Sequence, residues 1–236
     1  MRHKIKSAIK YLLSLLGIGV LFPGERTLQG LRPYVLEFYQ RQSTGILHIG
    51  ANNGSEALHY SQLNLPVIWI EADPAIFKSL QDHLTRFPMQ NALNVLLSDT
   101  NGPIDFFVTS NSGFSSSVHL LSQRGKDVWD IEVRESKRLN SLRFDDLVVP
   151  NLETFNFWVV DVQGHELQVL KGAEKSLLFV NWILVEVSTV PFYDNQCLFD
   201  EVDSWLESKG FYALYQPTQK HCEILYSRRP RNLKPQ

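Results

Sequence analysis

The chain has 236 residues, of which 44% are hydrophobic and 20% are charged, as in an ordinary globular protein with one large domain. The formal net charge of −2 gives no general attraction to a polyanion, so a nucleic-acid partner is not expected. Cys197 and Cys222 do not form a Cys/His zinc motif, and they are interpreted as free thiols of a reducing compartment.

Residues 1–22 form a segment of their own, in which apolar side chains recur at helical spacing and lysines lie on other faces. The apolar run from Tyr11 to Phe22 is too short to span a bilayer, which needs about 20 residues. Three interpretations remain open: a packing helix, a basic amphipathic helix at a membrane interface, and a signal peptide. The run ends in Pro23-Gly24-Glu25 without a small-residue cleavage site, which disfavours the signal peptide.

A further helix is expected over residues 27–42, and from Gly45 onward short apolar runs alternate with helical patterns. The runs are almost continuously apolar, which is typical of strands that are buried on both faces of a sheet. Their alternation with helices predicts crossover units and parallel strands. The predicted strands are 46–51, 67–72, 92–98, 157–162 and 182–188, and the helical patterns between them are 55–64, 74–87 and 165–179.

The end of the sheet is expected to differ from the rest. Residues 211–217 and 222–228 are strand-like runs on either side of the short segment 218–221, which predicts an antiparallel hairpin. The expected fold is therefore α/β, a mostly parallel doubly wound sheet that ends in an antiparallel hairpin. Between residues 103 and 157 we expect a strand, a loop rich in hydroxyl groups, and a second strand followed by a turn or short helix.

The segment ILHIGANNGSEALHY, residues 46–60, places Gly50 and Gly54 where the first strand ends and a helix begins. Ligands of open parallel sheets bind at the carboxyl ends of the strands. The segment lacks the lysine of a Walker phosphate-binding loop. Asn52 stands where a dinucleotide fingerprint needs its second glycine, and its side chain would obstruct a pyrophosphate. The segment therefore predicts a ligand site that does not hold a pyrophosphate.

Polar residues also end the next two predicted strands. Glu71 can accept hydrogen bonds from both hydroxyls of a ribose. Ser98 and Asp99 end the third strand, where a carboxylate can accept from an adenine amino group. Taken singly, each signal has an alternative: Glu71 as a solvated strand end, and Asp99 as a turn residue before Thr100-Asn101-Gly102. In succession, the three strand ends indicate a nucleoside without a pyrophosphate, and S-adenosylmethionine is the common cofactor of that description.

Several blocks of the sequence, within residues 45–226, resemble the FkbM family of S-adenosylmethionine-dependent methyltransferases. The most specific block is DVQGHELQVLKGA, residues 161–173, and the others are HIGANNGSEALHY, VIWIEADP, SGFSSSV and ILVEVSTVPFY. The resemblance implies a Rossmann-like methyltransferase fold and O-methylation, usually of hydroxyls on sugars, glycans or secondary metabolites. The chain departs from the family pattern at Asn140, Val159 and His165. The extent of the resemblance and the helical patterns before it predict three parts: an N-terminal helical appendage (1–42), a methyltransferase domain (43–229) and a C-terminal tail (230–236).

Transfer of an activated methyl group to oxygen needs alignment and a base. Asp161 ends the fourth predicted strand, where it can orient the substrate or act as base. His165 starts the next helix, and the ordinary imidazole pKa of about 6.5 suits a base; a surface histidine is the alternative. Glu186 ends the fifth strand, where a carboxylate is costly unless paired, so catalysis and a structural ion pair are both open. Glu166 is a helix cap or a catalytic group. Two carboxylates are too few for a metal site to be predicted.

The hydroxyl-rich loop carries Ser115, Ser116 and Ser117, which cover the site, bind substrate hydroxyls or form a plain surface loop. The sequence thus predicts an O-methyltransferase that acts on a small-molecule or glycan acceptor. A cytoplasmic location is expected, with peripheral membrane contact through residues 1–22 as a further hypothesis. The alternative function is an S-adenosylmethionine-binding module without catalysis. A nicotinamide oxidoreductase comes third, because Asn52 disfavours a dinucleotide.

Overall fold

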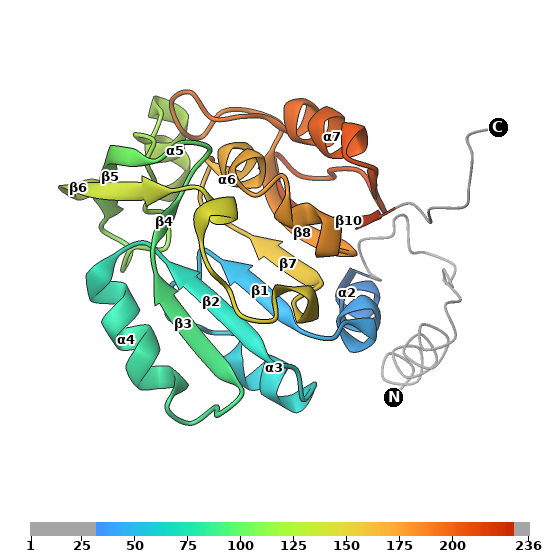
Figure 1. Ribbon diagram of the computed structural model, residues 1–236. Helices are drawn as coiled ribbons and strands as arrows, with labels where there is room; N and C mark the ends of the chain where they lie inside the picture. The colour runs from blue at the N-terminus through green and yellow to red at the C-terminus, as the bar shows by residue number, and fades with distance from the viewer. Residues whose placement is uncertain (1–31, 229–236) are drawn as a thin grey trace, which may run out of the picture. The chain divides into compact units, whose positions relative to one another are not determined.

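The computed structural model describes residues 32–228, which fall into two compact units, one ending at Ser43 and one beginning at Thr44. Among the described residues, the first unit contains the helix α2 (Arg32–Gln42), and the other elements belong to the second (Figure 1). The predicted segment 1–22, the first residues of the predicted helix 27–42 and the predicted tail 230–236 lie outside the described residues.

The second unit is built on a seven-stranded sheet with the order β3-β2-β1-β7-β8-β10-β9. All neighbouring strands are parallel except β10, which runs antiparallel to both β8 and β9. This confirms the predicted α/β fold with a mostly parallel sheet and a final antiparallel hairpin (Figure 1). The strands are β1 (Ile46–Ile49), β2 (Val67–Glu71), β3 (Gln90–Asn94), β7 (Phe157–Val160), β8 (Trp182–Ser188), β9 (Phe211–Ala213) and β10 (His221–Arg228).

The hydrophobic core explains why the central strands are so apolar. Every residue of β1 and of β7 is buried, because helices cover both faces of the sheet. Burying a large apolar side chain such as Trp158 or Leu170 contributes about 1.5–3 kcal/mol, so these layers supply most of the stability. The helices are α3 (Ala57–Gln62), α4 (Pro74–Leu84), α5 (Gln123–Trp129), α6 (Glu166–Gly172) and α7 (Phe199–Ser208).

The α4 helix begins where the sequence predicts it. Asp73 is its N-cap and accepts a hydrogen bond from the backbone N–H of Ala75 at 2.8 Å. Pro74 occupies the first turn, where its missing N–H costs nothing. Short 3-10 helices lie at Phe144–Asp146, Leu152–Thr154 and Ser176–Phe179. The helices α5 and α7 were not predicted from the sequence.

A second, three-stranded sheet lies beside the main one. Its two long strands were predicted from the sequence, but their pairing into a separate sheet was not. Its order is β4-β6-β5, with β4 (Leu96–Leu97), β5 (Gly102–Thr109) and β6 (Val133–Leu142). The predicted strand 92–98 is divided between the two sheets. The backbone N–H of Val95 donates to the carbonyl of Glu71 at the end of the main sheet, whereas Leu96 and Leu97 pair with β6. The expectation that Ser98 and Asp99 end the third strand of the main sheet is therefore wrong.

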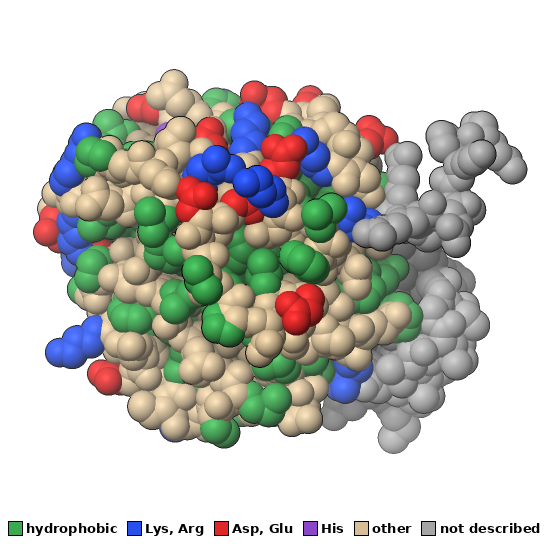
Figure 2. Space-filling model, viewed as in Figure 1, with side chains coloured by type: hydrophobic (Ala, Val, Ile, Leu, Met, Phe, Trp, Pro, Cys, Tyr) green, Lys and Arg blue, Asp and Glu red, His purple; other side chains and the backbone are tan. Residues whose placement is uncertain are grey.

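Acidic and basic side chains are interspersed on the face shown in Figure 2. This distribution agrees with the small net charge of the chain. Within residues 32–228, no helix combines the length and the apolar character that crossing a bilayer requires.

Candidate functional site

A cavity of about 220 Å³ lies at the carboxyl ends of the parallel strands. It is bounded by the turn after β1, the end of β2, the turn after β7 and the loop after β5. Several predicted site residues line it together, which are Gly50, Asn52, Glu71, Asp161 and His165. Further lining residues are Ile49, Ala51, Ala72, Leu96, Leu97, Phe106, Gly113, Phe114, Ser116, Val118, Val162 and Gln163.

The turn after β1 requires glycine at its first position. Gly50 has a φ of +87°, and a Cβ atom there would lie 1.6 Å from the backbone oxygen of Asp161. Only a residue without a side chain lets β1 and β7 approach so closely at their ends. Gly54 has a φ of +70° and packs against Leu80 of α4, so it shapes the turn but does not line the cavity.

Glu71 connects this turn to the end of β2. Its side chain is buried, and its Oε2 and Oε1 accept hydrogen bonds of 2.8 Å from the backbone N–H groups of Asn52 and Asp73. Burial raises the pKa of Glu71, although these two N–H groups oppose the shift. A carboxylate can accept about four hydrogen bonds, and the backbone N–H groups of Asn52, Asp73 and Ala72 act on Glu71, so acceptor capacity remains for a hydroxyl of a ribose. The residues present at this end of the cavity therefore fit S-adenosylmethionine.

Ser98 and Asp99 are not among the residues that line the cavity. Ser98 is buried, its hydroxyl lies 2.9 Å from Nε2 of His165, and it donates to Asp99 at 3.2 Å. The main chain turns toward the second sheet before these residues, and the cavity is lined there by Leu96 and Leu97 of β4. The assignment of Ser98 and Asp99 to the cofactor stays a prediction.

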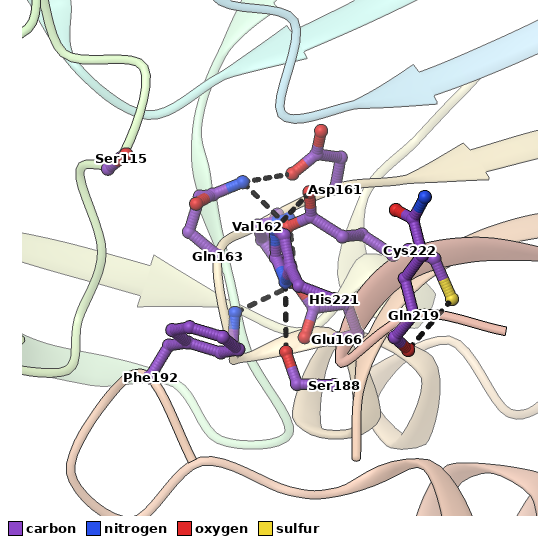
Figure 3. A network of polar contacts seen from close by, with 12 residues as sticks. Ser115, Asp161, Val162, Gln163, Glu166, Ser188, Phe192, Gln219, His221 and Cys222 are labelled. Carbon is purple, nitrogen blue, oxygen red and sulfur yellow. Dashed lines mark hydrogen bonds and ion pairs between the residues drawn. The ribbon is translucent and has the colours of Figure 1, made fainter. Parts of the chain in front are cut away.

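Three acidic side chains meet behind the cavity. The carboxyl groups of Asp161, Glu166 and Glu186, which we call the carboxyl cluster, have oxygen atoms within 4.8 Å of one another. The amide of Gln163 donates to Asp161 at 2.6 Å (Figure 3). The same amide donates to Glu186, also at 2.6 Å. The carboxyls of Asp161 and Glu186 are also hydrogen-bonded to each other. Asp161 alone of the three lines the cavity, so it connects the cluster to a ligand.

Glu166 closes the turn between β7 and α6. Its Oε1 accepts from the backbone N–H groups of Val162 at 3.1 Å and Gly164 at 2.9 Å. These contacts agree with the predicted capping role. Three carboxyls at this spacing could share a cation, but the backbone donors and the amide of Gln163 already lie among them. We therefore describe the cluster as a group that shares protons, and we assign it no metal.

Crowding and burial keep protons on this cluster near neutral pH. Removal from water, with the charge of Glu166 nearby, raises the pKa of Glu186 to about 8. Burial raises the pKa of Glu166 to about 7. Burial and the charge of Glu186 raise the pKa of Asp161 well above its ordinary value. Like charges so close together cannot all ionise, so the cluster can accept or release a proton at neutral pH.

His165 lies differently from what a solvent-facing base would require. Its Nε2 lies 2.9 Å from the hydroxyl of Ser98, and its Nδ1 lies 3.2 Å from Nε2 of His119. Burial, reinforced by His119, lowers the pKa of His165 to about 3. The imidazole is therefore neutral at neutral pH and is a weak proton acceptor. Its role as base, predicted from the sequence, is less favoured by this geometry than that of Asp161.

Two further residues complete the site and were missed in the sequence. Tyr193 donates to Oε1 of Gln163 at 2.6 Å and lies 3.1 Å from the carbonyl of Ser115. Gln163 itself has a φ of +57°, an uncommon conformation that these contacts hold in place. Gln163 and Tyr193 both lie in sequence blocks that resemble the family, but no sequence pattern indicates that their side chains contact each other.

His221 is the third missed residue. Its Nε2 lies 3.0 Å from Oε1 of Glu186, and its Nδ1 lies 2.9 Å from the hydroxyl of Ser188 (Figure 3). It is the first residue of β10, and because β10 is antiparallel to β8 its beginning lies at the edge where β8 ends. The predicted hairpin could have indicated this position. The first residue of an antiparallel strand lies at the same edge of the sheet as the carboxyl ends of the parallel strands.

The hydroxyl groups of the loop after β5 are used mainly within the protein. Ser117 donates to the carbonyl of Gln163 at 2.7 Å, Ser116 accepts from the backbone of Thr109 at 3.1 Å, and Ser115 accepts from the side chain of Asn111 at 3.0 Å. Only Ser116 of the three serines lines the cavity. The loop therefore covers the site and is tied to the turn after β7.

Comparison with known proteins places this geometry in a family. The chain is 25% identical over 171 residues to 2-O-methyltransferase NoeI of Sinorhizobium fredii, an alignment covering 69% of this chain and 70% of NoeI. It is 30% identical over 141 residues to hexuronic acid methyltransferase AglP of Haloferax volcanii, covering 59% of this chain and 54% of AglP.

A solved structure has the same fold. The N-terminal domain of EvdMO1, determined in the presence of SAH and D-fucose, has a TM-score of 0.50 and 10% sequence identity, and the superposition covers 90% of each chain. The family model of the methyltransferase FkbM domain matches residues 48–212. These residues include the glycine turn, Glu71 and the carboxyl cluster. The chain is a member of the FkbM family of S-adenosylmethionine-dependent methyltransferases.

Proposed function

We propose that this methyltransferase transfers the methyl group to a hydroxyl group of a carbohydrate. The observation that carries the proposal is the position of Asp161, which lines the cavity and belongs to a buried carboxyl cluster. A hydroxyl group must lose its proton when its oxygen is methylated, and a carboxyl cluster whose members titrate near neutral pH can take that proton up through Asp161. The names of NoeI and AglP, a 2-O-methyltransferase and a hexuronic acid methyltransferase, support a sugar as acceptor.

The protein's contribution to the reaction is alignment and proton acceptance. S-adenosylmethionine supplies a methyl group that is already activated by the positive sulfonium. Glu71 and the turn at Gly50 would hold the nucleoside end, since both line the cavity. Asp161 would orient the acceptor hydroxyl and receive its proton. Holding the two reactants in one geometry removes a large part of the entropic barrier, so the rigid turns after β1 and β7 are part of the catalytic apparatus.

The experiment is an acceptor screen with the full chain. The protein is incubated with S-adenosylmethionine and a panel of neutral sugars, uronic acids, oligosaccharides, phenols and amines, and formation of S-adenosylhomocysteine is measured. Methylation of a sugar is expected, and NMR of the product should show a methyl ether that resists saponification. A methyl ester on a uronic acid carboxyl, or turnover only with amines, would contradict O-methylation of a hydroxyl. Asp161→Asn serves as the variant with an impaired site.

We also propose that residues 1–42 are an appendage to the catalytic domain, residues 43–229, and that the segment 1–22 is not needed for cofactor binding. The site residues all lie after residue 43, which supports this division. A chain beginning at residue 23 should bind S-adenosylhomocysteine with the affinity of the full chain. If the segment 1–22 contacts membranes, only the full chain should bind liposomes that contain anionic lipid. Lost folding on deletion would instead favour a packing helix.

A further inference from the structure

We propose that His221 is the exit for the proton that leaves the acceptor hydroxyl, and that it acts through Glu186. The inference rests on the proposed function, and it assigns a role to a residue outside the cavity. His221 does not line the cavity, so it is a positioning and relay residue rather than one that touches the acceptor.

The contacts form one continuous path from the cavity to the surface. Asp161 lines the cavity and is hydrogen-bonded to Glu186, and Oε1 of Glu186 lies 3.0 Å from Nε2 of His221. The exposed fraction of the side chain is 14% for Glu186 and 25% for His221. A proton that enters at the buried end can therefore reach a group that water contacts.

The surroundings of His221 hold the ring in one orientation. Its Nδ1 is hydrogen-bonded to the hydroxyl of Ser188, which in turn accepts from the amide of Gln196 at 3.0 Å. Trp129 and Phe192 contact the ring edge-on, with centroids 5.3 and 5.4 Å away. With the Gln196 amide on one lone pair, the Ser188 hydroxyl can either donate to Nδ1 or accept from Nδ1–H. The relay requires the second arrangement, in which Nε2 carries no proton and can receive one from Glu186.

The charged groups around His221 come from four elements. Glu186 of β8 and Glu223 of β10 are its neighbours across and along the hairpin, and Asp161 after β7 and Glu166 of α6 act on it from further away. Burial lowers the pKa of His221, whereas that of Glu186 is raised to about 8. Both shifts favour a neutral pair at neutral pH, in which Glu186 carries the proton that His221 can accept.

The transfer is balanced without any further reactant. The acceptor's O–H bond breaks and its proton bonds to the unprotonated oxygen of the Asp161 carboxyl, whose own proton is the one shared with Glu186. The proton held by Glu186 passes to Nε2 of His221, while Glu186 takes over the proton shared with Asp161. The imidazolium then releases one proton to water. The cluster ends with the number of protons it had at the start, and the proton of the hydroxyl has left the protein.

The first test needs no acceptor. In protein with 15N-labelled histidine, the ring nitrogen shifts of His221 report its tautomer and its pKa. The proposal predicts a neutral ring at pH 7 with the proton on Nδ1, and little change in Glu186→Gln, because an amide donor replaces the protonated acid. A ring doubly protonated at pH 7 in the wild type, and neutral in Glu186→Gln, would show a fixed ion pair and overturn the relay.

The second test is kinetic and uses any acceptor that the chain methylates. His221→Asn keeps a polar group beside Glu186 but cannot take up a proton, so kcat should fall about 10- to 100-fold with the affinity for S-adenosylhomocysteine unchanged. Added imidazole should restore part of the rate. Lys220→Gln, an exposed neighbour, is the matched control. A full rate in His221→Asn, or a loss that follows reduced stability and is not rescued by imidazole, would refute the relay.

The two proposals fail in different ways. If no carbohydrate is methylated but another hydroxyl compound is, the sugar assignment fails, and the relay is still tested with that compound. If sugars are methylated but the NMR result is a fixed ion pair, the relay fails and the proposed function stands.

Discussion

The backbone N–H of Asn52 donates to Oε2 of Glu71 at 2.8 Å, so the turn after β1 is hydrogen-bonded to the last residue of β2. Each element fixes the other, because Glu71 needs donors to remain buried as a carboxylate and the turn needs an acceptor for its free N–H. The affinity of a nucleoside for Glu71 should therefore depend on the conformation of the glycine turn.

The first prediction concerns Glu71. Glu71→Ala removes the acceptors for the ribose and for the backbone of Asn52, so affinity for S-adenosylhomocysteine should fall by roughly 1.5–3 kcal/mol, the range for hydrogen bonds to a charged group. Glu71→Gln keeps the shape but loses one acceptor oxygen and should be intermediate. Isothermal titration calorimetry measures both. Unchanged affinity in Glu71→Ala would remove the ribose from this end of the cavity.

The second prediction separates backbone strain from steric overlap at Gly50. Gly210 also has a positive φ, of +85°, but nothing lies within 4 Å of the position of its missing Cβ. Gly210→Ala should therefore cost about 1–2 kcal/mol of unfolding free energy from strain alone. Gly50→Ala should cost distinctly more, because its Cβ would overlap the backbone of Asp161. Urea unfolding of both variants tests this, and equal costs would show that the two strands separate easily.

The third prediction concerns the base. Asp161→Asn should lower kcat by about two to four orders of magnitude with little change in cofactor affinity. His165→Ala should lower it less than about tenfold, because the buried imidazole is a weak proton acceptor with a pKa of about 3. The acid limb of the pH–rate profile should persist in His165→Ala. Its disappearance there would return the role of base to His165.

The fourth prediction concerns stability and pH. The pKa of Glu186 is raised from 4.5 to about 8, so its stabilising contribution is complete below 4.5 and is lost as the pH rises toward 8. The free energy of unfolding should fall in this window by up to about 1.4 kcal/mol per pH unit for each such group. Glu186→Gln should flatten the dependence measured by urea unfolding at pH 6 and 8. The exposed Glu132→Gln should leave it unchanged.

His165 should lower the free energy of unfolding at acid pH, in contrast to Glu186, which lowers it as the pH rises. Its pKa is lowered from 6.5 to about 3, so the buried neutral ring costs stability as the pH falls from about 6.5 toward 3. His165→Gln should be less sensitive than the wild type to a change from pH 6 to pH 4.5. An identical acid dependence in the two proteins would mean that other groups dominate this limb.

The fifth prediction compares two ion pairs from neighbouring residues of β6. Lys137 contacts both carboxylate oxygens of Asp73 at 2.9 Å, and Asp73 is only 1% exposed. Lys137→Met would leave that carboxylate buried without its cation and should cost roughly 2–3 kcal/mol. Arg138 pairs with Asp105 on the exposed surface, so Arg138→Met should cost less than about 1 kcal/mol. Chemical denaturation measures the unfolding free energy of both variants. Equal losses in Lys137→Met and Arg138→Met would contradict the distinction between the buried and the exposed ion pair.

The sequence was sufficient for the main sheet but not for the second one. Near-continuous apolar runs such as 157–160 report burial on two faces, and that signal survives without knowledge of the partners. The strand β4 has only two residues, which is too short for any periodicity to be visible. Residues 92–98 form two strands because Leu96 and Leu97 pair with Ser141 and Leu142 of β6, a contact between distant segments that local patterns do not contain.

The contrast between local patterns and contacts of distant segments also explains which site residues could be predicted. Gly50, Glu71 and Asp161 could be predicted because each follows a recognisable strand, and strand ends share one edge of a parallel sheet. The burial of His165 against Ser98 and His119 could not, because it follows from the path of the second sheet and of the loop after β5. Glu186 and Asp161 were both predicted as catalytic residues. The hydrogen bonds from Gln163 to both carboxyls depend on the left-handed backbone conformation of Gln163, which no sequence pattern predicted.

The antiparallel direction of β10 has a consequence for how the protein is made. This strand pairs with β8 along seven residues and also supplies His221. During synthesis β8 emerges long before β10, and until its partner arrives it presents a row of unpaired backbone groups that invites association with other chains. A chain interrupted before residue 221 would therefore lack the proposed proton exit and also be prone to aggregate. Completion of the proton path and protection of the nascent sheet edge depend on the same late strand.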